Sequence, residues 1–296
     1  MKQQTLCKNY SFEGKGLHTG KPVHIELCPA PDNFGICFQR TDLEGSALIE
    51  AVAANVKHTR RSTELAKGKA SVRTVEHILS ALTGLGVDNA LIRTDSAEMP
   101  ILDGSARPYV EAIVADGLAE QQEERVWIEL DHTVEFRNEK TGSWVRIEPA
   151  DTLSYECTID FNSRVLGVQT VKWSYGDDYA SQIAPCRTFC FFHEIVKMAA
   201  LGLVKGGDVE NAIVIVEKPV RPAQIARMAK VFHQPLLDVT EKGYLSNLEL
   251  RFEDECGRHK LLDLMGDLRL CGGFLKAKIS AYKPGHSINT KTAKLL

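Results

Sequence analysis

The sequence predicts an α+β protein, and three observations support this fold class. Short extended runs open the chain and return from Val126 onward. Two periodic helices, one predicted over Val72–Leu85 and one beginning near Gly257, are each followed by an extended segment. When His77 is aligned with His259, leucines and a glycine of the two helices coincide, which indicates a weak internal repeat, with chance as the alternative. A true repeat would let the two helices meet, with their histidines at one point.

Length, charge and composition limit the class of protein before any motif is considered. The chain has 296 residues, which suggests about two domains. Its net charge of -3 gives no overall attraction to nucleic acid or to an anionic membrane, so an anionic substrate must meet local basic residues. No apolar run approaches the roughly 20 residues that span a bilayer, and the N-terminus has no secretion signal. We therefore expect a cytoplasmic protein without stable membrane insertion, whose eight scattered cysteines are reduced.

The chain is predicted to open as a β-meander. Extended runs over Gln4–Phe12, Val23–Pro29 and Gly35–Thr41 are separated by turn-forming residues. The loop Gly14–Gly20 between the first two runs holds His18 among three glycines, but it matches no nucleotide-binding fingerprint. A tight hairpin is the simple interpretation of this loop, and a histidine facing a site is the alternative.

The helix over Val72–Leu85 is the first strong helical pattern. Thr74 is its expected N-cap, and Glu76 and His77 stand together in its first turn. Glycines at 84 and 86 are expected to end it, and Ala90–Thr94 follows as a strand.

A domain boundary is expected after the next helix. Asp103 is interpreted as the cap of a helix over Ser105–Asp116. The stretch Leu118–Arg125 is charged and unpatterned, and strand patterns resume directly after it. We therefore predict an N-terminal α+β domain of residues 1–122 and a C-terminal α+β domain of residues 123–296.

The second half is predicted to alternate between strands and helices. Its expected strands are Val126–Phe136, Ser143–Pro149, Tyr155–Phe161, Ala212–Val216 and Phe274–Tyr282. Its expected helices are Tyr179–Ile183, Glu194–Leu201, a basic helix over Pro222–Val231 inside an apparent insertion at Glu217–Glu249, and the helix that begins near Gly257.

The last of these helices carries potential metal ligands. His259, Asp263 and Asp267 recur every four residues, so an imidazole and a carboxylate can reach one ion from one helix face. A solvated helix face is the alternative interpretation. A catalytic zinc ion needs a third protein ligand, and composition leaves every other histidine open. The repeat favours His77, whose neighbour Glu76 is the type of carboxylate that serves as a base in hydrolytic zinc sites.

Six motifs in order resemble one family across essentially the whole chain. They are GLHTG at Gly16–Gly20, RTVEHI at Arg73–Ile78, PILDGSA at Pro100–Ala106, RTF at Arg187–Phe189, RFEDE with RHKLLDLMGDL within Arg251–Leu268, and AYKPGH at Ala281–His286. The chain resembles the zinc-dependent UDP-3-O-acyl-N-acetylglucosamine deacetylases of lipid A synthesis. The resemblance implies two similar two-layer α/β sandwich domains from an internal duplication, with the active site between them. It also implies an inserted β-α-β unit at about 189–218 in the second domain.

The resemblance assigns the site residues. His77, His259 and Asp263 would bind Zn²⁺, although the same ligands accept Fe²⁺. Glu76 would take a proton from the attacking water. Further roles are implied for the leaving group and the oxyanion: His286 as acid, Asp267 as its orienting carboxylate, and Lys260 with Thr188 as oxyanion donors.

The implied substrate is a UDP-3-O-(3-hydroxyacyl)-N-acetylglucosamine. The inserted unit, with Phe189, Phe191, Phe192, Ile195 and Val196, would line an acyl channel, although ordinary core packing is the alternative for any one of these residues. Lys283 and Phe161 resemble nucleotide contacts. The chain departs from familiar members in three places: Ser143 where some carry lysine, Val204 where some carry cysteine, and a longer Glu217–Glu249.

Other possibilities remain open on the sequence alone. Some family members are fused to a downstream 3-hydroxyacyl-carrier-protein dehydratase, and nothing within residues 1–296 carries that chemistry. A different zinc amidase or peptidase would use the same ligands with another pocket. A sugar-nucleotide binding protein without catalysis would leave the histidines and aspartates as a solvated face.

Overall fold

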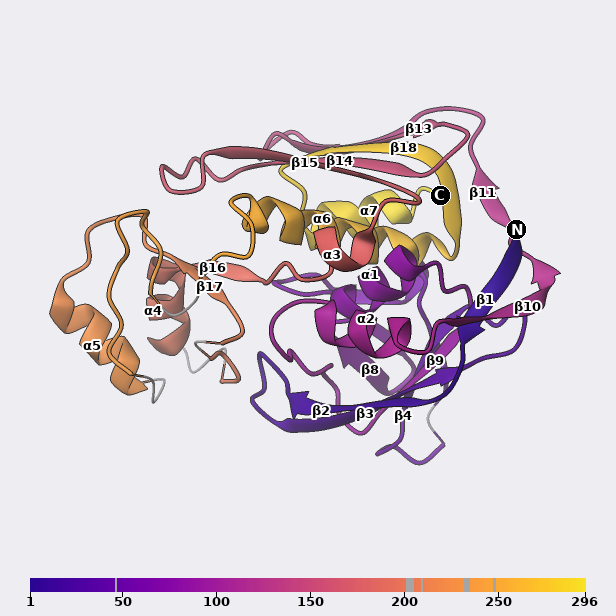
Figure 1. Ribbon diagram of the computed structural model, residues 1–296, viewed down its shortest axis with the longest axis horizontal. Coiled ribbons are helices and arrows are strands. Elements are labelled where there is room, and N and C mark those ends of the chain that lie inside the picture. Colours follow the sequence, from indigo (N-terminus) through magenta and orange to yellow (C-terminus); the bar gives the residue numbers. More distant parts are fainter. Residues whose placement is uncertain (46, 201–204, 209, 232–234, 247–248) are drawn as a thin grey trace.

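Two large sheets enclose a middle layer of helices. The computed structural model describes residues 1–45, 47–200, 205–208, 210–231, 235–246 and 249–296. One large sheet comes from the first half of the chain and the other from the second half, and the helices of the two halves pack against each other between them (Figure 1). This arrangement confirms the α+β class and the two similar sheet-and-helix layers.

The first half forms a five-stranded sheet in the order β2-β3-β9-β4-β5, a three-stranded sheet β6-β7-β8 and the pair β1-β10. The strands are β1 (Lys2–Leu6), β2 (Tyr10–Lys15), β3 (Pro22–Pro29), β4 (Ile36–Arg40), β5 (Ile49–Glu50), β6 (Val56–His58), β7 (Glu64–Lys67), β8 (Ala70–Arg73), β9 (Ala90–Thr94) and β10 (Leu118–Glu124).

The predicted meander is wrong, because β9 lies between β3 and β4. β9 pairs antiparallel with β3 and parallel with β4. The parallel pair needs a long crossover, which is supplied by the segment containing helix α1 (Glu76–Leu85). The single run expected over Gln4–Phe12 is likewise divided into β1 and β2. Alternating hydrophobicity finds strands, but it does not determine their partners.

Helix α1 starts later than expected. Val72 lies in β8, and Thr74 has a φ of 60°, outside the helical region. Val75 takes the N-cap position without a side-chain hydrogen bond, so the prediction of Thr74 as cap is wrong. The C-terminal end at Leu85 was expected correctly: Gly86 adopts the left-handed conformation, with φ 83°, and ends the helix, whereas Gly84 lies within the helix and does not end it.

Asp103 does not cap a helix. Helix α2 spans Arg107–Val114, and its N-cap residue makes no side-chain hydrogen bond. The Asp103 carboxylate instead accepts hydrogen bonds from the backbone N–H and the hydroxyl of Ser105, and it pairs with Arg251 at 3.1 Å. Arg251 comes from the second half, so this carboxylate joins the two halves.

The second half forms a six-stranded sheet around β18 (Phe274–Tyr282). β13 pairs antiparallel with β18, and β14 and β11 pair parallel with it. The other strands of the sheet are β11 (Trp127–Glu129), β12 (Val134–Asn138), β13 (Ser143–Pro149), β14 (Ser154–Asp160) and β15 (Val168–Ser174). The single run predicted over Val126–Phe136 is therefore two strands, and β15 was not predicted.

Besides the helices of a smaller unit described below, this half contains α3 (Tyr179–Gln182), α6 (Glu255–Leu268) and α7 (His286–Ala293), of which α7 was not predicted. α1 and α6 pack directly against each other. A Cβ atom at Gly266 would lie 2.0 Å from the carbonyl oxygen of Glu76, so only glycine permits this approach. The two helices of the weak repeat therefore meet, as the sequence suggested.

A smaller unit projects from one end of the molecule (Figure 1). It contains β16 (Phe189–Phe191), α4 (Phe192–Ala200) and β17 (Ile213–Ile215), with β16 and β17 parallel, followed by α5 (Pro222–Val231). Residues Leu201 and Val204 lie outside the described ranges. The limits predicted for an inserted unit stay a prediction. In the described part of the chain, no helix is both long and apolar enough to cross a membrane.

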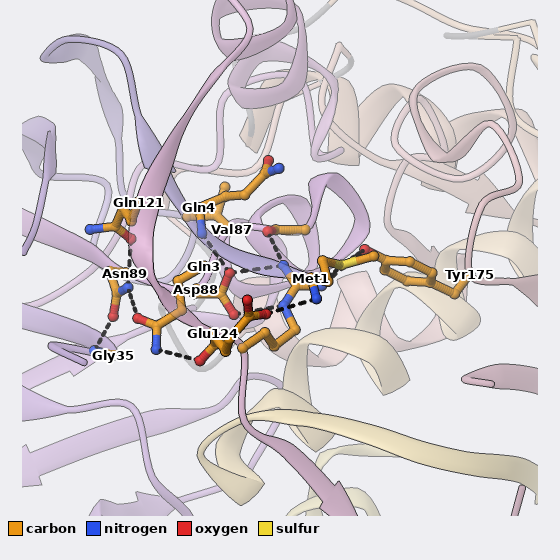
Figure 2. Close-up of polar contacts among 12 residues, drawn as sticks. Met1, Gln3, Gln4, Gly35, Val87, Asp88, Asn89, Gln121, Glu124 and Tyr175 are labelled. Carbon is orange, nitrogen blue, oxygen red and sulfur yellow. Dashed lines mark hydrogen bonds and ion pairs between the residues drawn. The ribbon is translucent and has the colours of Figure 1, made fainter. Parts of the chain in front are cut away.

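Leu118–Arg125 is not an irregular linker. Most of it is β10, which pairs with β1. Figure 2 shows Gln3 and Gln4 of β1 facing Asp88 and Asn89 of the loop after α1, where the N–H of Gln4 donates to Asp88 at 2.7 Å and the amide of Asn89 donates to Gln3 at 2.7 Å. The domain boundary at 122/123 falls inside this strand and stays a prediction.

Arg125 fastens the first half to the second. Its side chain is 1 % exposed and forms a two-pronged ion pair with Asp88, with both N···O distances 2.8 Å. The guanidinium also lies 4.0 Å from the ring centre of Phe274 on β18 and donates to the hydroxyl of Tyr175 at 2.9 Å. A buried pair of this kind is costly to break, because one charge is then left without a partner.

We expect Asp88→Ala to destabilise the fold by about 3–5 kcal/mol, because it leaves the buried Arg125 guanidinium unpaired. The midpoint of urea unfolding measures this change. Asp116→Ala is the matched control, since Asp116 pairs with Lys8 at the surface, and it should move the midpoint little. Equal midpoints for the two variants would contradict a structural role for the Asp88–Arg125 pair.

Candidate metal centre and active site

Two histidines and an aspartate converge where α1 meets α6. His77 is the second residue of α1, and His259 and Asp263 lie one turn apart on α6. One ligand atom from each of the three lies within 4.8 Å of the others, and all three side chains are buried. Oδ1 of Asp263 is 3.8 Å from Nε2 of His77 and 3.5 Å from Nε2 of His259. The interpretation of α6 as a solvated face is therefore wrong.

The protonation of the cluster suits a cation. Burial lowers the pKa of His77 to about 3 and also lowers that of His259, so both imidazoles are neutral and carry a lone pair. Burial alone would raise the pKa of Asp263, but Lys260 and the surrounding histidines together outweigh burial and hold the pKa of the carboxyl well below its usual range. The cluster thus presents two neutral nitrogens and one carboxylate.

One oxygen of this cluster lacks a hydrogen-bond partner. Oδ2 of Asp263 accepts from Lys260 at 2.6 Å, while the buried Oδ1 has no hydrogen-bond partner in the described structure. Nδ1 of His259 lies 3.0 Å from the carbonyl oxygen of Cys186, to which it donates, so Nε2 is left as the acceptor. A buried carboxylate oxygen beside imidazole nitrogens matches what a divalent metal ion needs, so these residues could hold one.

Glu76 borders the cluster and is held in place by Thr63. The N–H of Thr63 donates to Oε2 of Glu76 at 3.0 Å. Oε1 of Glu76 lies 3.8 Å from Nε2 of His286. Burial raises the pKa of Glu76 to about 7, although the charge of His286 opposes this rise. A carboxylate with such a pKa can take up a proton near neutral pH.

His286 opens α7 and is oriented by a buried carboxylate. Its Nδ1 donates to Oδ2 of Asp267 at 2.9 Å, and the same oxygen accepts from Asn289 at 2.9 Å. Thr63 donates its hydroxyl to the other oxygen of Asp267. Burial lowers the pKa of His286, but the carboxylates of Asp267 and Glu76 outweigh burial and raise it to about 9. His286 is therefore a cation at neutral pH.

A cavity of about 310 Å³ connects these groups to an apolar region. At one end it is lined by the metal cluster, Glu76 and His286, and by Lys260 and Thr188. Toward the projecting unit it is lined by apolar side chains, among them Phe189, Phe192 and Ile195. The chain thus joins a polar reaction centre to an apolar pocket.

Three predicted substrate contacts lie outside this cavity. Phe161 and Phe191 do not line it, and their ring centres are 5.7 Å apart. Phe161 also packs edge-on against Phe189 at 5.5 Å. Lys283 pairs with Asp160 at 3.2 Å and lines a second cavity of about 410 Å³, which it shares with His286 and Arg61. His286 lines both cavities, so the two are neighbours.

The structure adds three residues to the site, of which the sequence had raised only His18, as an alternative. His18 lines the cavity beside the metal cluster, which supports the alternative left open for its glycine-rich loop. Arg61 borders both cavities from a left-handed backbone conformation with φ 67°. Thr63 supports both Glu76 and Asp267. No motif marks Arg61 or Thr63, because their proximity arises only in the folded chain.

Comparison with known proteins gives consistent matches. The family model described as UDP-3-O-acyl N-acetylglycosamine deacetylase matches residues 3–234 and 233–296. A protein of Porphyromonas gingivalis named bifunctional enzyme LpxC/FabZ is 43% identical over 100% of this chain, and the chain spans 64% of that protein's length. A Bacteroides thetaiotaomicron protein of the same name is 42% identical over 99% of the chain and 64% of its own length. A Cellvibrio japonicus protein named UDP-3-O-acyl-N-acetylglucosamine deacetylase is 39% identical over 100% of the chain and 90% of its own length.

Proposed function

The chain belongs to the family of UDP-3-O-acyl N-acetylglycosamine deacetylases, and from this we propose that it hydrolyses the N-acetyl amide of a UDP-3-O-(3-hydroxyacyl)-N-acetylglucosamine. This is the committed step of lipid A biosynthesis, and its products are acetate and a free glucosamine amine. The observation that supports it most directly is the unpartnered oxygen of Asp263 beside two neutral imidazoles, next to Glu76 and His286.

Zn²⁺ is the proposed cofactor, with His77, His259 and Asp263 as its ligands. Two nitrogens and one carboxylate form a donor set typical of catalytic zinc, and Fe²⁺ suits the same set. A bound zinc ion supplies Lewis acidity, which polarises a carbonyl group and makes water more acidic. The remaining steps fall to the protein's own side chains.

Glu76 acts as the general base. Thr63 holds one carboxylate oxygen, and the other faces His286 inside the cavity. This leaves Oε1 of Glu76 as the oxygen that would take a proton from the attacking water. A positioned base is worth about a hundredfold to ten-thousandfold in rate.

His286 acts as the general acid. Amide hydrolysis needs a proton on the leaving nitrogen, because an amide anion is a very poor leaving group. Asp267 accepts from Nδ1, which leaves the Nε2 proton of His286 to be donated. The buried carboxylates keep this imidazole protonated well above neutral pH. Asp267 thus acts through His286 and not on the substrate.

Lys260 and Thr188 are proposed to stabilise the oxyanion. Both line the cavity, and the Lys260 ammonium lies 2.6 Å from Asp263 at the metal cluster. An ammonium group beside developing negative charge stabilises the transition state more than the ground state.

The two cavities suit the two arms of the substrate. The apolar part of the first cavity, with Phe189 and the projecting unit, suits the acyl chain. The second cavity is lined by the cations Arg61, Lys283 and Lys291, which suit the diphosphate. Phe161, which is 42% exposed, is the proposed contact for uridine, with Phe191 packed behind it.

The activity proposed concerns residues 1–296. The chain covers 64% of the length of relatives with bifunctional names, and no dehydratase activity is proposed for this chain. The cytoplasmic location expected from the sequence stays a prediction.

The test is an assay of acetate release by the purified protein. We expect release from a UDP-3-O-acyl-N-acetylglucosamine and none from a peptide amide. Release from the peptide instead would favour a different amidase, and binding of the UDP-sugar without release would contradict a deacetylase.

A further inference from the structure

Helix α5 forms one wall of the first cavity. Ile225, Met228 and Ala229 of α5 line the cavity, while Ala226 and Arg227 between them are exposed. The spacing of three and four residues puts the lining side chains on one helix face. Figure 1 shows α5 at the extreme end of the molecule, beyond α4 and away from α1 and α6.

The packing around α5 is separate from the main core. Ile225 belongs to a small buried cluster with Phe192, Val214, Val216 and Leu245. Met228 packs against the same cluster. These residues come from α5, from the β-α-β unit and from the segment after α5. The residues at the apolar end of the cavity therefore pack in a small core that is separate from the main one.

The segment that carries α5 is anchored at both ends. Before the helix, Glu217 accepts from the N–H of Arg164 at 2.6 Å and from the hydroxyl of Ser163. After the helix, the N–H of Leu245 donates to Val214 of β17 at 2.9 Å, and the N–H of Val216 donates to Gly243 at 2.8 Å. The returning chain thus extends the β16-β17 pair, and α5 is held over the pocket as a fixed wall.

We infer that α5 closes the acyl pocket and that Met228 and Ala229 set the longest acyl chain that the enzyme accepts. This inference rests on the proposed function. Met228 and Ala229 are partly buried and line the cavity, and neither is one of the buried members of the small core, so their size changes the room available to a ligand. Each methylene that is buried or excluded changes affinity about fourfold.

The experiment measures kcat/KM for UDP-3-O-acyl-N-acetylglucosamines that differ only in acyl length. Ala229→Leu should lower kcat/KM for the longest accepted chains roughly tenfold or more and leave short chains unchanged. Met228→Ala should shift the optimum toward longer chains. Ala226→Leu is the matched control, because it makes the same change on the exposed face of α5, and it should leave the length profile unchanged.

Binding provides a readout that does not depend on catalysis. Displacement of a fluorescent fatty acid by fatty acids of graded length should show the same shift in Ala229→Leu and none in Ala226→Leu. Equal length profiles for these two variants, or a loss that is uniform across all lengths, would overturn the inference about α5. The unsubstituted protein could release no acetate from any member of the series while Ala229→Leu still shifts the length dependence of binding. That result would contradict the proposed reaction but support the role of α5 in limiting acyl length.

Discussion

Removal of bound metal is expected to abolish acetate release, and return of zinc is expected to restore it. The reason is that the buried His77, His259 and Asp263 side chains leave an unpartnered oxygen and two neutral imidazoles directed at one position. Asp263→Ala should lose the ion and lower kcat roughly a thousandfold, which corresponds to several kcal/mol of Lewis-acid stabilisation. Metal analysis of the purified protein and activity before and after chelation measure both effects.

The control for this prediction is His24, a histidine that belongs to neither the metal cluster nor the cavity lining. His24 is exposed on β3, and His24→Ala should keep the metal content and turnover of the unsubstituted protein. A fully active protein without stoichiometric metal would refute the metal centre. A folded Asp263→Ala variant with unchanged metal content would show that Asp263 is not a ligand.

Activity is expected to fall at high pH as His286 loses its proton. His286 must be protonated to serve as acid, and its pKa is raised to about 9, so kcat should stay high below that pH and decline as pH rises through it. Asp267→Asn removes the carboxylate that contributes most to raising this pKa, so burial gains weight and the decline should move to lower pH. His286→Ala should lower kcat about a hundredfold to ten-thousandfold and remove this alkaline limb.

The pH profile separates the positioning role of Asp267 from a purely structural one. Loss of packing alone would lower kcat at every pH and leave the alkaline limb in place. Asp160→Asn is a suitable control, because Asp160 is a carboxylate near Lys283 outside the His286 network. If Asp267→Asn leaves the alkaline limb where it is, Asp267 does not control the proton of His286.

Several elements followed directly from local patterns. The helix Pro222–Val231 and the strands Ala90–Thr94, Ser143–Pro149 and Phe274–Tyr282 have the limits expected from periodicity and breakers. The meander, the Thr74 cap, the Asp103 cap and the irregular stretch before Arg125 were wrong. Three of these errors concern a partner that is distant in sequence: β9 inserts between β3 and β4, Asp103 pairs with Arg251, and β10 pairs with β1. The Thr74 cap was wrong because the backbone of Thr74 leaves the helical region, with φ 60°.

The site likewise combines features that local sequence patterns predict with features that depend on contacts between distant segments. The spacing of His259 and Asp263 on one helix, and the likeness between their helix and that of His77, were visible in the chain itself. Thr63 was not, although it holds Glu76 through its N–H and Asp267 through its hydroxyl. A threonine between two short strands has no periodicity or motif that distinguishes it from any other threonine.

The sequence by itself determined which residue types could bind a metal and move protons, because ligand chemistry and helical spacing are local properties. The tertiary structure decided that α1 and α6 approach closely enough at Gly266 to bring those residues together, and that burial and neighbouring charges set their protonation. It also decided that α5 closes the apolar pocket. Distances and dielectric environment depend on contacts between remote segments, and such contacts exist only once the chain has folded.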